Sequence, residues 1–192
     1  MKVLLINGSS YEKRDTYEAL SIVAEELKNA GVDTEWFWIG HGPFRGCIDC
    51  EKCEGSGRCV FDDDVVNPLI EAILDADGVI IGTPVYFCAP SGALMAVLNR
   101  VFYAASEHGG RLFEGKLGAA VATMWRSGGN SALAALNKYF EISGMPIVPS
   151  NYWNMYFSPR SDVGDDVFGR ENLQKLAANM AEMLQKMSNH QE

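Results

Sequence analysis

The sequence predicts an α/β protein: one doubly wound domain, residues 1–192, whose parallel sheet is covered by helices on both faces. Two observations lead to this prediction. Five short apolar runs of strand type alternate with five segments of helical periodicity, and this alternation indicates βαβ crossovers and therefore parallel strands. No linker, repeat or low-complexity tract divides the 192 residues, a length that suits a single domain with a sizeable core.

The expected elements follow one another along the chain as strand and helix. Residues 3–7 form a continuous apolar run, which is typical of a strand buried on both faces. The first helix begins near Thr16, and Gly31 supplies its C-terminal stop. The later strands are expected at residues 34–39, 78–83, 117–124 and 146–148, and the later helices around residues 65–74, 94–102, 132–139 and 170–187.

The composition limits the possible partners. Hydrophobic residues make up 47% of the chain and charged residues 21%, and the formal net charge is −9 without any block of basic residues. Because phosphate-backbone binding needs clustered lysine and arginine, neither a nucleic-acid partner nor an anionic membrane is expected. The amino-terminal apolar run is too short for a signal peptide, and no run is long enough to span a bilayer. We therefore expect a cytoplasmic protein with reduced thiols.

The loop after the first strand carries groups suited to a phosphate. Gly8 permits a tight turn, and Ser9, Ser10 and Thr16 offer hydroxyl groups next to the first helix. Free backbone N–H groups and the positive end of the helix dipole would face the same space. A phosphate monoester needs this combination. The alternative is a polar cap that satisfies only its own helix.

The loop after the third strand offers a surface for a flat ring. Pro84 is expected to end the strand, and Val85, Tyr86 and Phe87 follow it. An isoalloxazine ring needs such apolar packing for its faces and directed donors for its heteroatoms. For either aromatic side chain, packing in the core is the alternative.

The loop after the fourth strand reads Trp125, Arg126, Ser127, Gly128 and Gly129. The two glycines let the backbone approach a planar ligand closely. The tryptophan could pack beside the ring, and the arginine could stabilise negative charge on a reduced flavin. A surface ion pair is the alternative role for the arginine.

Four cysteines fall within thirteen residues of a loop at residues 46–60, namely Cys47, Cys50, Cys53 and Cys59. Their spacing, C-x2-C-x2-C-x5-C, is compact enough for four thiolates to converge, and iron–sulfur clusters demand such soft ligands. Two alternatives stay open. The motif could hold a structural zinc ion, or its thiols could remain uncoordinated.

Taken together, the loops resemble the NADPH-dependent FMN reductase group of flavodoxin-like proteins. The resemblance runs over nearly the whole chain, from residues 7–10 through 83–87 and 126–129 to 151–154. It implies a five-stranded parallel sheet in the order 2-1-3-4-5 and bound FMN. The positions carried over are Ser9, Ser10 and Thr16 at the phosphate, Pro84, Val85, Tyr86 and Phe87 beside the isoalloxazine, and Arg126, Ser127, Gly128 and Gly129 at its pyrimidine side. Family members often have proline and arginine where Ser10 and Tyr11 stand, so the cation that contacts the phosphate stays open.

The cysteine loop resembles the compact motif of archaeal and bacterial iron–sulfur flavoproteins. That resemblance implies a [4Fe–4S] cluster near FMN at a subunit interface, in a homodimer or homotetramer. The expected function is electron transfer from NAD(P)H through FMN to a quinone, a nitro or azo compound, a free flavin or the cluster. Flavin N5 carries this chemistry, so no catalytic side chain is assigned. The alternative is an electron carrier that takes electrons from ferredoxin without using NAD(P)H.

Overall fold

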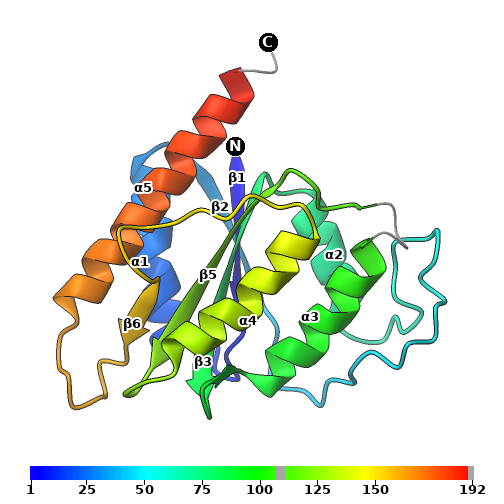
Figure 1. Ribbon diagram of the computed structural model, residues 1–192, viewed down its shortest axis with the longest axis horizontal. Coiled ribbons are helices and arrows are strands. Elements are labelled where there is room, and N and C mark those ends of the chain that lie inside the picture. The colour runs from blue at the N-terminus through cyan, green and yellow to red at the C-terminus, as the bar shows by residue number, and fades with distance from the viewer. Residues whose placement is uncertain (107–110, 190–192) are drawn as a thin grey trace.

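The computed structural model describes residues 1–106 and 111–189. Its centre is a twisted sheet that lies between two layers of helices (Figure 1). The strands come in the spatial order β2 (Asp33–Trp38), β1 (Lys2–Asn7), β3 (Gly78–Tyr86), β5 (Leu117–Met124) and β6 (Met155–Phe157), with β4 (Ala89–Pro90) beside β3. All neighbours in the main path are parallel. The predicted order, with β1 in second place and β3 in the centre, is confirmed.

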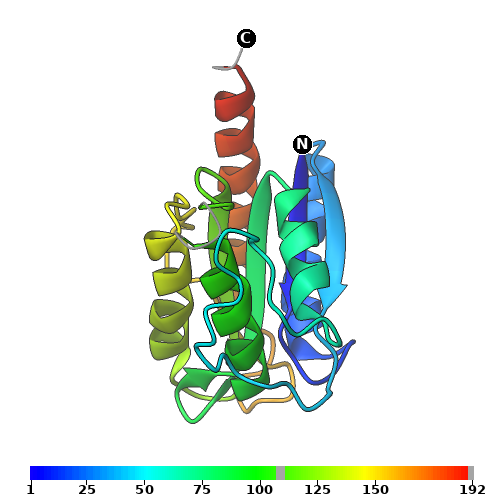
Figure 2. The ribbon, with the colours of Figure 1, turned by 90° about the vertical axis from the view of Figure 1, so that its right-hand side faces the viewer.

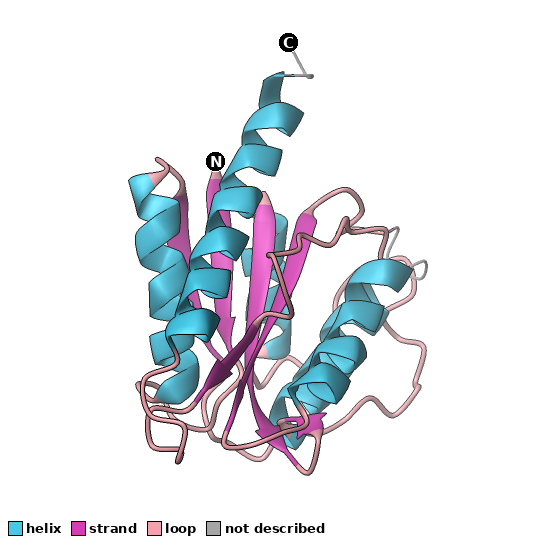
Figure 3. Cartoon of the chain, turned by 60° about the vertical axis from the view of Figure 1, so that its left-hand side comes forward, coloured by secondary structure: helices cyan, strands magenta, loops and turns pink. Residues whose placement is uncertain are grey.

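The helices divide between the two faces of the sheet (Figures 1 and 3). One face carries α1 (Asp15–Asn29) and α5 (Val167–Asn189), and the other carries α2 (Val66–Leu74), α3 (Gly92–Ala105) and α4 (Gly129–Ile142). Successive strand residues point to opposite faces, so in β1 the side chain of Leu4 joins the core under α2–α4, and that of Leu5 joins the core under α1 and α5. Both faces are therefore apolar, as the continuous apolar runs predict. Within residues 1–106 and 111–189, no helix has both the length and the hydropathy needed to cross a bilayer.

The edge of the sheet differs from the prediction. Residues 146–148 do not form the fifth strand, because only Ile147 pairs there, in an isolated bridge to Gly118. Pro146 and Pro149 flank this bridge, and proline cannot donate to a ladder. The parallel edge is instead formed further along by β6, opposite the end of β5.

The third strand is also longer than predicted. Pro84 does not end it, because β3 continues to Tyr86 and Pro84 pairs with Thr123 of β5. At that level β1 has already ended, so β3 has a ladder partner on one side, where a proline is tolerated. The chain then turns at Phe87 and Cys88, whose φ angles are 49° and 62°, and returns antiparallel as β4. The sheet thus has six strands instead of five, and one of them is antiparallel.

Gly118 is expected to be indispensable for packing α4 against β5. A Cβ atom at this position would stand 2.6 Å from Cδ1 of Phe140, and Phe140 is fully buried. Because the buried ring would have to shift, Gly118→Ala should lower the free energy of unfolding by about 1–3 kcal/mol, measured by urea denaturation. Gly92→Ala is the matched control, since a Cβ there would meet no atom within 4 Å. An equal loss in both variants would contradict this account.

Candidate functional site

A cleft opens at the carboxyl edge of the sheet, which is the lower edge in Figure 1. It lies at the switch point of the sheet, where the connection after β1 leads to α1 on one face and the connection after β3 leads to α3 on the other. Open α/β sheets bind ligands at this point. The cleft is lined by Ser9, Tyr11, Arg14, Asp15, Thr16, Pro84, Val85, Tyr86, Thr123, Met124, Trp125, Ser158 and Arg160. The connections after β1, β5 and β6 contribute to it, together with the carboxyl ends of β3 and β5 and the first turn of α1.

The loop from β1 to α1 is held in shape by its own hydrogen bonds. Asn7 is buried, and its Oδ1 accepts from the backbone N–H of Ser9 at 3.0 Å while its Nδ2 donates to the carbonyl of Glu12 at 2.9 Å. Ser9 Oγ accepts from the N–H of Tyr11 at 3.1 Å, which leaves the hydroxyl proton of Ser9 to donate. The loop is thus organised before any ligand arrives.

Two buried threonines form the base of the cleft. Thr16 Oγ1 lies 2.9 Å from Thr123 Oγ1, so the first turn of α1 is tied to the end of β5. Gly82 makes this close approach possible, because a Cβ there would stand 2.9 Å from Cγ2 of Thr16. The positive end of the α1 dipole is therefore fixed against the carboxyl edge of the sheet.

Two arginines line the cleft, and they differ in whether a carboxylate pairs with them. Arg160 binds Asp15 at 2.8 Å between Nη2 and Oδ2, and Ser158 donates to the same carboxylate at 2.6 Å. The guanidinium of Arg14 instead lies over the ring of Tyr11, 3.5 Å from its centroid. Among the ion pairs of the described residues, none involves Arg14. Arg14 is thus the cation of the cleft whose charge no carboxylate offsets.

Asp15 should make the stability of the protein depend on pH in the acid range. Burial raises the pKa of this carboxyl, but hydrogen bonds from Arg160 and Ser158 outweigh that effect and hold the pKa below its ordinary value of 3.8. The ionised carboxylate therefore stabilises the fold above about pH 3.8, and this contribution is lost as the pH falls through the lower folded-state pKa.

The expected result is that FMN-free wild-type protein has a higher Tm than Asp15→Asn at pH 7, and that the difference narrows below pH 3.8. Thermal unfolding of both proteins followed by circular dichroism from pH 7 to pH 3 measures it. A difference in Tm that stays constant over this range would show that the charge of Asp15 is not what stabilises the contact.

The cleft collects half of the residues that the sequence predicts for the flavin. Ser9, Thr16, Pro84, Val85, Tyr86 and Trp125 line it, whereas Ser10, Phe87, Arg126, Ser127, Gly128 and Gly129 do not. Phe87 is fully exposed at the hairpin turn, and Arg126 pairs with Asp162 at 3.0 Å on the surface. Gly128 caps the amino end of α4 with φ 91°, and a Cβ there would stand 2.7 Å from Cα of Cys88, so the loop after β5 packs closely against the turn between β3 and β4.

Seven lining residues lie outside the predicted set: Tyr11, Arg14, Asp15, Thr123, Met124, Ser158 and Arg160. Thr123 belongs to the predicted fourth strand, and the position of its side chain at the strand end was the signal that could have found it. Ser158 and Arg160 follow β6, and the only signal for them was the strand at Met155–Phe157, which the prediction placed elsewhere.

The four cysteines line a second pocket together. They come from the long connection between β2 and α2, which passes beside α2 and α3 (Figure 2). The remaining wall includes Phe61, Arg100 and Tyr103. In the described part of the chain, no three Cys, His, Asp or Glu side chains are grouped so that one metal ion could bind between them. A [4Fe–4S] cluster differs from a single ion, because each of its four irons takes one thiolate.

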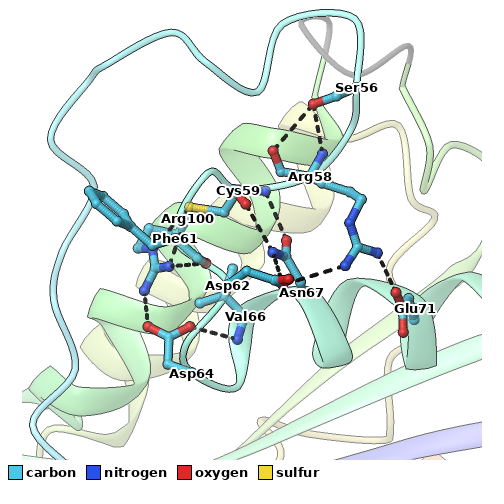
Figure 4. A network of polar contacts seen from close by, with 10 residues as sticks. All are labelled: Ser56, Arg58, Cys59, Phe61, Asp62, Asp64, Val66, Asn67, Glu71 and Arg100. Atoms are coloured by element: carbon cyan, nitrogen blue, oxygen red, sulfur yellow. Dashed lines mark hydrogen bonds and ion pairs between the residues drawn. The ribbon is translucent and has the colours of Figure 1, made fainter.

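The fourth cysteine is the most firmly held (Figure 4). The backbone N–H of Cys59 donates to Oδ1 of Asn67 at 2.8 Å, and its carbonyl accepts from Nδ2 of Asn67 at 2.9 Å. Arg100 of α3 donates from Nε and Nη2 to its Sγ, each at 3.3 Å. Cys53 is buried, and burial raises the pKa of its thiol. The neighbouring thiols of Cys47, Cys50 and Cys59 raise this pKa further. Cys47 and Cys50 are exposed.

Five parallel strands in the order β2-β1-β3-β5-β6 define a flavodoxin-like fold. At the switch point of this sheet the cleft is lined by the loop from β1 to α1 and by aromatic side chains. An archaeal flavodoxin has the same fold, with 12% identity, a TM-score of 0.63, and 96% of this chain and 99% of that chain covered. RosB, solved with bound 8-demethyl-8-formylriboflavin-5′-phosphate, superposes with a TM-score of 0.79 at 16% identity over 98% of this chain and 81% of its own.

Residues 1–159 match the sequence profile of the NADPH-dependent FMN reductase family. The chain belongs to this family. The iron–sulfur flavoprotein MJ1083 of Methanocaldococcus jannaschii is 30% identical over 196 residues, which cover 96% of this chain and 97% of that protein. The predicted relationship to both groups is thereby confirmed.

As a member of the FMN reductase family the protein is a flavoprotein that uses FMN, and the cleft fits this cofactor. A phosphate requires positive charge and donors, and the cleft supplies Arg14, the amino end of α1 and the hydroxyl of Ser9. The ring requires flat apolar surface, and Tyr86 and Trp125 supply it while remaining about half exposed, at 47% and 50%. An open, flat surface of this kind suits a cofactor whose ring must stay accessible to an electron donor or acceptor.

Proposed function

We propose that the protein is an FMN-dependent oxidoreductase of the iron–sulfur flavoprotein type, with FMN in the cleft and a [4Fe–4S] cluster on Cys47, Cys50, Cys53 and Cys59. The observation that carries this proposal is that all four cysteines line one pocket in a chain that belongs to an FMN-binding family. The protein accepts electrons from a reduced ferredoxin and delivers them to a small acceptor such as a quinone or a nitro compound.

Within this proposal the residues of the cleft bind and orient the cofactor. Arg14, Ser9 and Thr16 would bind the phosphate, and Tyr86 and Trp125 would pack against the ring. FMN supplies hydride and single-electron chemistry when it is bound. The chain's part is to neutralise the phosphate and to exclude water from one face of the ring, and no side chain is needed as a nucleophile. Accordingly, no catalytic side chain is proposed.

One helix connects the two pockets. Helix α3 is capped by Ser91, five residues after Tyr86, which lines the cleft, and it presents Arg100 and Tyr103 to the cysteine pocket. Arg100 comes nine positions after the cap, which is an axial rise of about 14 Å at 1.5 Å per residue. A rigid element of this length keeps the two pockets at a fixed separation.

The direct test is to purify the protein without oxygen and to measure its absorption spectrum, its FMN content, and its iron and sulfide. We expect flavin bands, one FMN per chain and about four irons per chain. Flavin without iron would show that the protein is a flavin reductase whose four thiols are free. Zinc in place of iron would make the cysteine loop a structural site.

A second candidate is direct use of NAD(P)H, which is favoured by the match to the NADPH-dependent FMN reductase family and by the half-exposed flat surface of Tyr86 and Trp125. Stopped-flow measurement of FMN bleaching separates the two candidates. Rapid bleaching by NADPH or NADH, but not by reduced ferredoxin, would favour this second function. The reverse result would favour the first.

The setting of the protein is part of the same proposal. We propose that it acts in the cytoplasm, where thiols are kept reduced, and that it assembles as a homodimer or homotetramer, as in the family that it resembles. Light scattering of the holoprotein measures the assembly. A monomer at micromolar concentration would exclude a cluster placed at an interface between copies.

A further inference from the structure

Arg100 is a buried cation whose guanidinium is aimed at one of the cysteines. Its side chain is only 1% exposed. Nε and Nη2 each lie 3.3 Å from Sγ of Cys59, Nη2 also donates to the carbonyl of Phe61 at 3.1 Å, and Nη1 forms an ion pair with Asp64. All three nitrogens of the guanidinium thus have partners in the connection that carries the cysteines (Figure 4).

This arrangement is specific because a buried charge is costly unless it is fully paired. Asp64 is itself fixed, since its Oδ1 accepts from the N–H of Val66 at 3.1 Å. The planar guanidinium then directs its free edge at the sulfur, which a flexible ammonium group does not do. Among the hydrogen bonds of the described residues, those from Arg100 are the only ones that a cysteine Sγ accepts.

We propose that Arg100 is a positioning residue for the metal ligand Cys59, and that its two N–H···S hydrogen bonds raise the reduction potential of the bound cluster. This inference rests on the proposed function. Adding an electron to the cluster increases the negative charge on its thiolate sulfurs. N–H donors and a nearby positive charge stabilise that charge, so they favour the reduced state of the one-electron couple.

The test compares anaerobically reconstituted holoproteins by redox titration, with the cluster followed by electron paramagnetic resonance and FMN by absorbance. In Arg100→Gln, the ratio of reduced to oxidised cluster at a given applied potential should fall about tenfold, which corresponds to a shift of about −59 mV for one electron. The FMN couple in the same sample should not move, because Arg100 does not line the FMN cleft.

Arg58→Gln is the matched control. Arg58 stands next to Cys59 in the chain, but its guanidinium pairs with Asp62 and Glu71 on the surface. Losing this positive charge should leave the cluster potential as in the wild type. If Arg100 acted only through its positive charge, Arg100→Gln and Arg58→Gln would shift the cluster potential by similar amounts. That result would overturn the inference.

Arg100→Lys covers the case in which Arg100→Gln does not fold. Lysine keeps the buried charge opposite Asp64 but not the planar pair of donors, so a smaller negative shift is expected. A wild-type cluster potential in a variant that keeps four irons would overturn the inference. If the wild type itself takes up no cluster, the proposed function fails and the inference fails with it. If the wild type holds a cluster and the clusters of the Arg100 variants have the same reduction potential as that of the wild type, only the inference fails.

Discussion

Replacing Cys50 with serine should remove most of the iron from anaerobically purified protein while leaving FMN bound. Serine has nearly the same size, but its hydroxyl is too weak an acid to serve as the anionic soft ligand that the thiolate provides. Cys50 is exposed, so the substitution costs the fold little. It does not line the FMN cleft, so flavin binding should stay within the wild-type range. Iron and sulfide analysis, set against FMN content, measures the effect.

The fifth cysteine of the chain is the control for this prediction. Cys88 is also exposed, but it lies at the turn between β3 and β4 and does not line the cysteine pocket. Cys88→Ser should therefore retain its iron. Equal iron in Cys50→Ser, Cys88→Ser and the wild type would show that the metal is not held by the four-cysteine motif. Joint loss of iron and FMN in Cys50→Ser would point to unfolding.

The central strands could be predicted because their own sequences require them to be buried on both faces. Residues 3–6, 78–82 and 117–122 are continuous runs of small and branched apolar side chains, and such runs are stable only when both faces are covered. The strand order followed from the resemblance to a known family. The edge strand Met155–Phe157 is three residues long, too short for such a pattern, and becomes a strand only through pairing with β5.

The candidate site was predictable where its residues are neighbours in the chain. The spacing of the four cysteines predicted that they meet, and they line one pocket. By contrast, Arg100 is 41 residues from Cys59, and Arg160 is 145 residues from Asp15. Such pairs depend on how α3 and the loop after β6 pack against the sheet. Neither arginine stands in a local pattern that separates it from an exposed arginine such as Arg126.

Arg14→Gln should weaken FMN binding about 10- to 100-fold, because a hydrogen bond to a charged group contributes about 1.5–3 kcal/mol. The FMN phosphate is a dianion at neutral pH, and Arg14 is the cation in the cleft that no carboxylate of the described residues neutralises. Its stacking on Tyr11 holds the guanidinium beside the amino end of α1. Quenching of flavin fluorescence during titration of apoprotein gives the dissociation constant.

Riboflavin distinguishes loss of a phosphate contact from general damage to the cleft. It carries the same ring without the phosphate, so its affinity should be the same for Arg14→Gln and for the wild type. Lys13→Gln removes the same charge one residue earlier, at a side chain that does not line the cleft, and should change FMN affinity less than threefold, the screened effect of a distant surface charge. If Arg14→Gln weakened riboflavin and FMN equally, the arginine would be shaping the ring site. If it weakened neither, the phosphate would lie elsewhere along the carboxyl edge of the sheet.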